Sequence, residues 1–343
     1  MDAVAKANSG DTITVAPGVY YGSIDFSGKA LDIVSSGGAA VTTIYASPGH
    51  QVVYAGNGEG PGTVLDGFTL SGGGNATTPA IEEEFSSLTL KNDVITGTTG
   101  NLTVYARSSF MTLDHVTIDG TNTASDGMML QARRGELILK DSDVTCGSIP
   151  IAYRQEHGSA MVDGSTIHCA GATAVSIFHS QGRVQRSVLD GLLDVEDEST
   201  DSEPTVVEGS VLLGGAYAYY TWVQLYNVVA EAAITLDYVS FTAENSVFTG
   251  GACGINATDY TAVSVSYSNF YGNTSNICGM ADPVGTSGNI GVSPDFMGAT
   301  DFHLASHSLL IDAGAPDAGF LDTDGTRDDI GAYGGPMSMD GGW

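Results

Sequence analysis

The chain has 343 residues, and its 40 acidic residues against 11 lysines and arginines give a net charge of −29. So few cations exclude binding to nucleic acids and to anionic membranes, because both need clustered positive charge. The 46 glycines and the 42% of hydrophobic residues predict a turn-rich folded chain and not a disordered one. The sequence contains no recognisable transmembrane segment or signal peptide.

Ten hydrophobic pairs recur along the chain in steps of 18 to 26 residues, and the two members of each pair lie five residues apart. The first members are Leu65, Leu90, Leu113, Leu139, Val162, Val184, Val207, Leu225, Ala243 and Val265. The second members are Leu70, Ile95, Ile118, Val144, Ile167, Leu189, Leu212, Ala230, Phe248 and Phe270. Fixed periods of this length are typical of repeat architectures. The pairs therefore predict a solenoid with one pair in each coil.

A turn residue stands between the two members of each pair. Two positions after the first member, the chain has Gly67, Asn92, His115, Asp141, Gly164, Arg186, Gly209, Asn227, Asn245 and Tyr267. Gly, Asn and Asp tolerate left-handed backbone angles, so this column predicts a tight turn, and His115 is expected to be a turn residue. Before each pair, apolar and polar residues alternate, which predicts a strand with one buried face.

Coils with three short strands and little helix predict an all-β fold, a parallel β-helix of about 10–12 coils. Each coil buries its inner face only by stacking on its neighbours. An antiparallel sandwich would need hairpin turns and would not keep one phase over ten repeats. Leucine-rich repeats have similar periods, but their Leu/Asn signature is absent here.

The segments at the two ends of the chain complete this pattern. The opening segment is Gly10–Tyr20, and the closing segments are Phe302–Leu304, Ile311–Gly314 and Asp329–Tyr333. With them, the chain resembles the right-handed parallel β-helix superfamily of the secreted bacterial type, which includes pectate lyases. The resemblance implies a helical cap within residues 1–20, coils through residue 279 and an irregular C-terminal cap over residues 280–343 of the same domain. It identifies a fold and not an activity.

Four cysteines fall at matching places on neighbouring coils. Cys146 and Cys169 occupy equivalent positions 23 residues apart, and Cys253 and Cys278 also lie on adjacent coils. Neighbouring strands are roughly 4.8 Å apart, which is inside the Cα range of a disulfide. We expect two disulfides in this pairing and an exported protein, secreted or at the cell surface, whose leader has been removed from this sequence. Stacked reduced thiols are the alternative.

The third strand of each coil directs two columns of side chains outward. In chain order these are Glu82 and Glu84, Tyr105 and Arg107, Gln131 and Arg133, Arg154 and Glu156, Ser176 and Phe178, Ser199 and Asp201, Tyr217 and Tyr219, Thr235 and Asp237, and Ala257 and Asp259. Such a stripe is typical of a surface that binds an extended sugar chain, because rings stack on pyranoses and Arg donates to hydroxyls or acid groups. The alternative is a solvated face in which Arg and Glu satisfy cross-strand pairing.

If the protein is an enzyme, β-elimination or hydrolysis of a polysaccharide is expected. A lyase needs a base and a cation that neutralises the uronate, so the candidate catalytic residues are Arg133, Arg154, Glu156 and His157. His157 is a better base than a guanidinium, and Glu156 would orient an arginine or bind Ca²⁺. The expected substrate-binding residues are Glu84, Tyr105, Arg107, Gln131, Arg134, Phe178, His179, Tyr217 and Tyr219.

Distances restrict the hydrolytic alternatives. Glycosidases need two carboxylates about 5–5.5 Å apart for retention or about 6.5–9.5 Å apart for inversion. From the strand spacing, Glu84 and Glu156 would be about 14 Å apart, and Glu156 and Asp201 about 9.6 Å, which is marginal for inversion. Asp237 and Asp259 are expected on adjacent coils, where they could hold a cation. Ca²⁺ is therefore the one cofactor that the sequence suggests.

The three consecutive glutamates Glu82–Glu84 are expected to be solvated. The sequence as a whole predicts an exported β-helix that binds a polysaccharide or cell-surface glycan along the outward stripe. A non-enzymatic cell-surface, adhesive or filament-forming module is the alternative, because no signature of a known lyase or hydrolase family is present.

Overall fold

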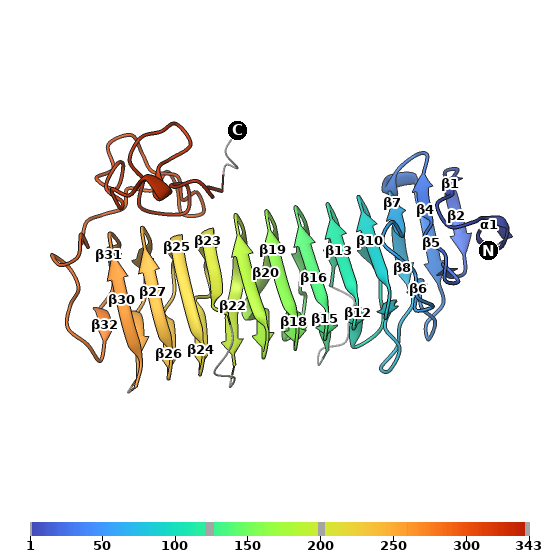
Figure 1. The fold of residues 1–343 in the computed structure, drawn as a ribbon, viewed down its shortest axis with the longest axis horizontal. Coiled ribbons are helices and arrows are strands. Elements are labelled where there is room, and N and C mark those ends of the chain that lie inside the picture. The colour runs from blue at the N-terminus through green and yellow to red at the C-terminus, as the bar shows by residue number, and fades with distance from the viewer. Residues whose placement is uncertain (1, 121–126, 198–202, 259, 340–343) are drawn as a thin grey trace. The chain divides into compact units, whose positions relative to one another are not determined.

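The computed structural model describes residues 2–120, 127–197, 203–258 and 260–339. These residues form an all-β parallel solenoid of about 11 turns, which confirms the predicted fold class. The chain divides into two compact units. Unit 1 comprises residues 1–161 and 165–180, and unit 2 comprises residues 162–164 and 181–343. Figure 1 shows the strands as successive parallel arrows, and the two units are described separately below.

In unit 1, the strands fall into three stacks, which we call A, B and C in the order in which the chain visits them. Stack A contains β1 (Thr12–Val15), β4 (Asp32–Ser35), β7 (Val64–Asp66), β10 (Ser87–Lys91), β13 (Phe110–Asp114) and β16 (Glu136–Lys140), and β19 (Ser159–Asp163) follows them in sequence. Stack B contains β2 (Gly18–Tyr21), β5 (Thr42–Ala46), β8 (Thr69–Gly72), β11 (Val94–Thr96), β14 (Thr117–Asp119) and β17 (Asp143–Thr145). Stack C contains β3 (Ile24–Asp25), β6 (Val53–Ala55), β9 (Ile81–Glu84), β12 (Leu102–Arg107), β15 (Met128–Arg133) and β18 (Ile151–Glu156). The long strand β20 (Thr166–Phe178) pairs with both β17 and β18, so it closes stacks B and C together.

Unit 2 repeats this plan with longer strands that pass from one stack to the next. Stack A begins with β21 (Gln181–Gln185) and ends with β27 (Ser240–Glu244) and β30 (Ala262–Ser266). Strands β23 (Thr205–Leu212) and β25 (Trp222–Ala230) run through stacks A and B, and β28 (Val247–Thr249) and β31 (Asn269–Tyr271) complete stack B. Stack C contains the end of β22 (Val188–Glu196), then β24 (Ala216–Tyr219), β26 (Ile234–Asp237), β29 (Cys253–Ala257) and β32 (Ser275–Cys278).

The repeated hydrophobic pairs form the core. Leu65, Leu90, Leu113 and Leu139 lie in register on successive strands of stack A and are fully buried. Their partners five residues later are buried in the same way in stack B. Each pair therefore fills two corners of one coil and packs on the pairs above and below it.

The residue between the two members of each pair turns the chain, as predicted. Asn92, His115, Asp141, Arg186 and Asn227 all have positive φ, between 47° and 57°. The next residue points inward and is often a buried serine. In unit 1, the Ser142 hydroxyl accepts a hydrogen bond from the Val116 N–H of the preceding coil at 2.9 Å and donates to its own chain at Lys140.

The same contact recurs from coil to coil and forms a serine ladder. The Ser142 N–H donates to Ser165, the Ser187 N–H to Ser210, the Val228 N–H to Ser246, the Ser246 N–H to Ser268 and the Ser268 N–H to Asn289. A buried N–H without a partner costs free energy, so each hydroxyl satisfies a donor that the turn would otherwise leave unpaired.

The N-terminal segment contains one short helix, α1 (Asp2–Lys6). The first solenoid strand already begins at Thr12 and pairs with β4. Residues 12–20 of the expected cap therefore belong to the first coil. A short 3₁₀ helix, η1 (Ala39–Val41), precedes β5.

Residues 280–339 of unit 2 are mostly irregular and include one 3₁₀ helix, η2 (Ala318–Phe320). They close the last coil, where Ile290 bridges Asn269, and they also cover an outer face of stack B. On that face Val211, Val229 and Val247 form a cluster with the buried side chains of Phe302, Leu310, Ile330 and Ala332. The segment therefore packs along the side of the unit 2 coils as well as at their end.

Asp328 fixes this segment to two coils of unit 2. Its carboxylate accepts hydrogen bonds from the side-chain amides of Asn227, at 2.7 Å, and Asn245. The Asp328 side chain is fully buried, and burial raises the pKa of its carboxyl to about 8. Burial also raises the pKa of the neighbouring Asp329, to about 6.

Candidate functional site

The outward face of stack C in unit 1 brings together the residues that the sequence singled out. Strand pairing aligns Glu84, Arg107, Arg133, Glu156 and Phe178 in one column. The second column contains Glu82, Tyr105, Gln131, Arg154 and Ser176. We call these two columns, with the residues that follow them in the turn, the arginine face. Its columns agree with those expected from the repeat.

One carboxylate organises the centre of the arginine face. Glu156 Oε2 lies 2.8 Å from Arg133 Nε, and Glu156 Oε1 lies 2.8 Å from Arg154 Nε. The Gln131 side-chain amide also donates to Glu156, at 3.4 Å. Two guanidinium groups from adjacent coils therefore share one carboxylate, and each uses its Nε for that contact.

The other two arginines of the face differ in how they are paired. Arg107 lies 3.3 Å from Glu84 and also 5.8 Å from the ring centroid of Phe85. The exposed side chain of Arg134 has no partner among the described residues. The face thus combines ion-paired arginines with at least one that is open to a ligand.

The turn that follows stack C carries aromatic and imidazole rings in a left-handed backbone conformation. His157 and His179 have φ values of 54° and 46°, and their rings stack with centroids 5.3 Å apart. Phe178 packs edge-on against His179, and the guanidinium of Arg154 lies 5.3 Å from the Phe178 centroid. Bulky residues seldom adopt positive φ, so the fold holds these rings at some conformational cost.

This geometry supports binding more directly than catalysis. Arg133 and Arg154 are both ion-paired with Glu156, and a guanidinium is a poor base. The same two contacts hold Glu156 as an orienting group. Of the four candidate catalytic residues, His157 alone presents an exposed ring that is not committed to an ion pair in the described residues.

The consecutive glutamates of β9 do not all face solvent, contrary to the expectation from the sequence. Glu83 points into the core, where its column continues through Ala106 and Ala132. Within the described part of the chain, neither of its carboxylate oxygens has a hydrogen-bond partner. Burial raises the pKa of the Glu83 carboxyl to about 8. The period-2 alternation of the strand was the signal that placed Glu83 inward.

The corresponding face of unit 2 is aromatic. Tyr217 and Tyr219 lie in the two outward columns, where they pair in register with Thr235 and Asp237. The turn that follows carries Tyr220, Tyr238 and Tyr260, whose rings stack with centroids 4.6 and 5.3 Å apart. We call these three residues the tyrosine stack. The sequence predicted the first two tyrosines but not the stack. The signal was present, because Tyr220, Tyr238 and Tyr260 stand at the same place in their coils as Arg134, His157 and His179 in unit 1.

Two carboxylates expected on this face, Asp201 and Asp259, lie outside the described residues. Strand pairing places Asp194 and Glu196 in the two outward columns next to Tyr217 and Tyr219, where Ser199 and Asp201 were expected. The prediction assumed the usual distance from stack C to the pair member Val207, whereas β22 ends at Glu196, further from Val207 than expected. The Thr258 hydroxyl donates to Asp237 at 2.5 Å. The cation site between Asp237 and Asp259 stays a prediction.

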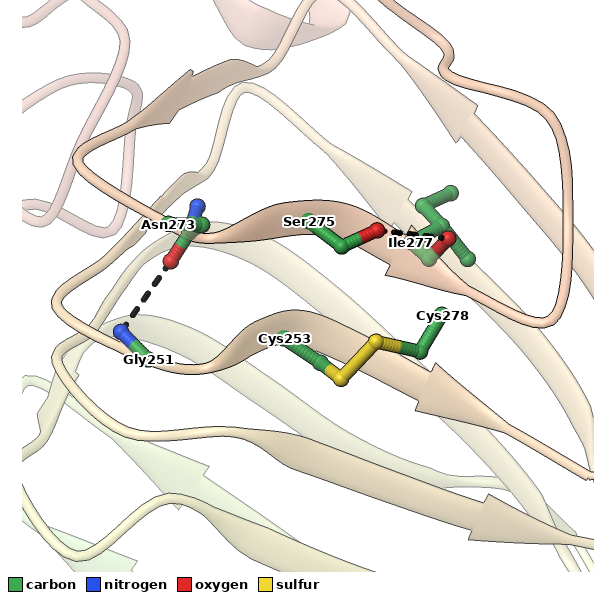
Figure 2. Close-up of a disulfide and its surroundings, with 6 residues drawn as sticks. All are labelled: Gly251, Cys253, Asn273, Ser275, Ile277 and Cys278. Atoms are coloured by element: carbon green, nitrogen blue, oxygen red, sulfur yellow. Dashed lines mark hydrogen bonds between the residues drawn. A yellow bond between two sulfur atoms is a disulfide. The ribbon is translucent and has the colours of Figure 1, made fainter.

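Both predicted disulfides are present. Cys146 is bonded to Cys169 in unit 1, with Cα atoms 5.2 Å apart, and Cys253 is bonded to Cys278 in unit 2, with Cα atoms 5.6 Å apart. Figure 2 shows the second disulfide beside the hydrogen bond from the Gly251 N–H to the Asn273 side chain, at 3.1 Å. Disulfides of this kind are typical of proteins that fold in an oxidising compartment.

Comparison with known proteins does not assign the chain to a family. No protein-family model matches it, and no curated protein matches it significantly. None of the helices in the described part of the chain is long and apolar enough to cross a membrane.

Proposed function

We propose that this is an exported β-helix protein that binds an extended acidic polysaccharide along the arginine face of unit 1. The observation that carries the proposal is the shared carboxylate of Glu156, which holds the Nε atoms of Arg133 and Arg154 on adjacent coils. The terminal amino groups of Arg133 have no partner among the described residues, and its side chain is 50% exposed. Paired terminal amino groups fit carboxylate or sulfate oxygens.

The charge of the face supports an acidic ligand. Arg107, Arg133, Arg134 and Arg154 are four of only 11 basic residues in a chain of net charge −29. Such a local reversal of sign would attract anionic groups that the rest of the surface repels. Because the arginines stand on successive coils roughly 4.8 Å apart, they suit a polymer with regularly spaced charges.

Rings at the same face suit the sugar itself. Tyr105 lies between Glu82 and Gln131 in its column, and Phe178 and His179 lie beside Arg154. Aromatic rings commonly contact the apolar faces of pyranoses, while neighbouring polar groups bind the hydroxyls. The two disulfides support export, because they are stable in oxidising surroundings.

Cleavage of the bound polymer is the finer form of the proposal. His157 would be the base, and Arg133 and Arg154 would neutralise the uronate carboxylate, as β-elimination requires. A structural or adhesive module is the other candidate, because Glu84, Arg107, Arg133 and Glu156 also satisfy one another as a ladder of ion pairs.

The test is direct binding of polygalacturonate, alginate and a sulfated glycan to the full chain, with dextran as the neutral polymer, by calorimetry at several salt concentrations. The double variant Arg133→Gln, Arg154→Gln should lower the affinity for the acidic polymers about tenfold or more, which corresponds to about 1.4 kcal/mol. Ultraviolet absorbance of unsaturated products and assays for reducing ends would detect turnover, which His157→Ala should abolish.

Arg183→Gln is the matched control. Arg183 is 48% exposed and ion-paired with Glu208 at 3.4 Å, but it lies on stack A and not on the arginine face. This variant should bind acidic polymers as the native protein does. Equal affinity of the native protein and the double variant for every acidic polymer would leave the structural module as the better explanation.

A further inference from the structure

The turn between stacks A and B in unit 1 carries a second group of chemically active side chains. Asp114 ends β13, His115 follows it in the turn, and Asp141 occupies the same turn position as His115 on the next coil. One ligand atom from each of the three lies within 4.8 Å of the others. Among the described residues, no other three His, Cys, Asp or Glu side chains meet in this way.

We propose that Asp114, His115 and Asp141 form a binding site for a first-row divalent ion of the Zn²⁺ type. Imidazole nitrogen with carboxylate oxygen is a donor set that suits Zn²⁺, whereas Ca²⁺ and Mg²⁺ prefer oxygen alone. Zn²⁺ binds these ligands at about 2.0–2.2 Å, so tetrahedral ligand atoms lie roughly 3.4 Å apart. Rotation of the side chains of His115 and Asp141, of which the His115 side chain is 57% exposed, allows that contraction.

Cross-strand pairing explains only part of the cluster. In stack A, the last strand position alternates in sign through Asp66, Lys91, Asp114 and Lys140. That alternation accounts for Asp114 beside Lys140 as an ordinary charge ladder. It does not account for His115 and Asp141, which stand one residue further on, in the turn. These two residues add an imidazole and a second carboxylate beside Asp114 and Lys140, whose opposite charges already compensate each other.

Lys140 marks the place that a cation would take. Its Nζ lies 3.8 Å from an oxygen of Asp114 and 3.6 Å from an oxygen of Asp141. At these separations the ammonium is attracted to both carboxylates without a hydrogen bond to either. A divalent ion bound by the two carboxylates and the imidazole would displace this ammonium. Lys140 therefore competes with the metal for the two carboxylates and should lower the affinity for it.

His115 is positioned for such a role by its neighbour. Its Nδ1 lies 2.6 Å from an oxygen of Asp114. A metal ion bound here would take the place of the proton that these two atoms share, with Nδ1 and an oxygen of Asp114 as two of its ligands.

The experiment is calorimetric titration of the full chain with Zn²⁺ at neutral pH, in excess Mg²⁺ to saturate weak carboxylate sites. His115→Asn and Asp141→Asn should each lower the affinity of the tightest site about tenfold, since each removes or weakens one ligand. Asparagine accepts the left-handed backbone, so both variants keep the turn. Lys140→Met should raise the affinity, which a merely structural ion-pair cluster would not do.

Two controls separate this site from general binding to an acidic surface. His50→Asn removes an exposed histidine elsewhere in unit 1 and should leave the affinity unchanged. In nuclear magnetic resonance spectra, His115 should shift before His303, which also lies 2.6 Å from an aspartate oxygen but belongs to no such three-residue group. Equal affinity of the native chain and His115→Asn, or a first shift at His303, would overturn the proposal.

Discussion

Stack C presents charge pairs in unit 1 and tyrosines in unit 2, on the same kind of strand and turn. In unit 1, the outward columns join Glu156 to Arg133 and Arg154. In unit 2, the corresponding columns contain Tyr217 and Tyr219, and the turn carries the tyrosine stack. The coil therefore determines where a side chain stands but not what it binds. In a solenoid, function depends on the outward side chains, whose identity the fold does not constrain.

The stacked tyrosines offer a ligand less than their number suggests. The rings of Tyr220 and Tyr238 are nearly parallel at 4.6 Å, so each covers a face of the other. Only the outer end of the stack, at Tyr260, has a ring that is 83% exposed. Sugar stacking needs an open ring face, which makes unit 2 the weaker candidate for glycan binding.

Buried carboxyl groups give a second contrast. Glu83 of unit 1 lies in the core, where neither oxygen has a hydrogen-bond partner among the residues that the structure describes, whereas Asp328 of unit 2 accepts hydrogen bonds from two asparagines. Burial raises both pKa values to about 8. A hydrogen bond from Asn227 lowers the pKa of Asp328 in part, but burial still raises that pKa at least as far above its ordinary value of 3.8 as it raises the pKa of Glu83 above 4.5.

Of the substitutions considered, Glu83→Gln should change the free energy of unfolding most. A carboxyl with a raised folded-state pKa makes its full contribution to stability below its unfolded value of 4.5, and the contribution is lost as the pH rises towards about 8. The variant should therefore match the native protein at about pH 4 and be more stable by roughly 4 kcal/mol at pH 9, because a rise in pKa from 4.5 to about 8 corresponds to about that free energy. Urea unfolding at both pH values, with hydrogen exchange to localise the change to unit 1, measures it.

Glu84→Gln is the control for this change, because it alters the neighbouring carboxylate, which faces outward beside Arg107. Its effect should stay within about 1 kcal/mol at either pH. If Glu83→Gln leaves the pH dependence of unfolding as it was, folding does not raise the pKa of the Glu83 carboxyl.

Asp328→Asn should give a smaller net gain in stability at high pH, because the variant also alters the hydrogen bonds that Asn227 and Asn245 donate in unit 2. Docking of residues 302–332 should weaken in the native protein as the pH rises from about 4 to about 8, because Asp328 ionises beside Asp322, Asp329 and Glu244. The variant should lose most of this slope, at a cost of about 1 kcal/mol at low pH for an altered hydrogen bond. Hydrogen exchange of Ile330 and its neighbours is the readout, and an unchanged slope would assign it to Asp329.

The smallest effect is expected from Tyr238→Asn. The variant loses two ring contacts worth about 0.5–1.5 kcal/mol each at most, but asparagine relieves the strain of a φ of 56°. The net change in unfolding free energy should therefore be under about 1 kcal/mol, and the affinity for acidic polysaccharides should be unchanged. A clear loss of that affinity would move the glycan site from unit 1 to unit 2.

The sequence alone predicted the parts of the molecule that repeat. The hydrophobic pairs, the left-handed turn at His115 and both disulfides follow from a fixed period, since neighbouring coils place equivalent residues side by side. The columns of the arginine face followed from the same count. The count failed at β22, where Glu196 stands in place of Asp201, because more residues separate this strand from the next hydrophobic pair, at Val207, than in the other coils.

Other features depended on contacts that a period cannot show. Nothing in the spacing says that Glu156 is shared between two arginines or that Asp328 reaches Asn227 across about a hundred residues of chain. The serine ladder was visible in principle, because Ser142, Ser165, Ser187, Ser210, Ser246 and Ser268 all stand three positions after the first member of a pair. The function of these serines in joining coils could be recognised only from the structure, which shows which N–H group donates to each hydroxyl.

That ladder also bears on how such a protein can change in evolution. Each serine hydroxyl joins its own coil to the coil before it, through a backbone N–H that every residue except proline carries. A whole coil could therefore be duplicated or deleted, and the coils that become neighbours could form the same hydrogen bond. Lengthening the molecule would then require no new core design, and each added coil would supply fresh outward positions on which selection could act.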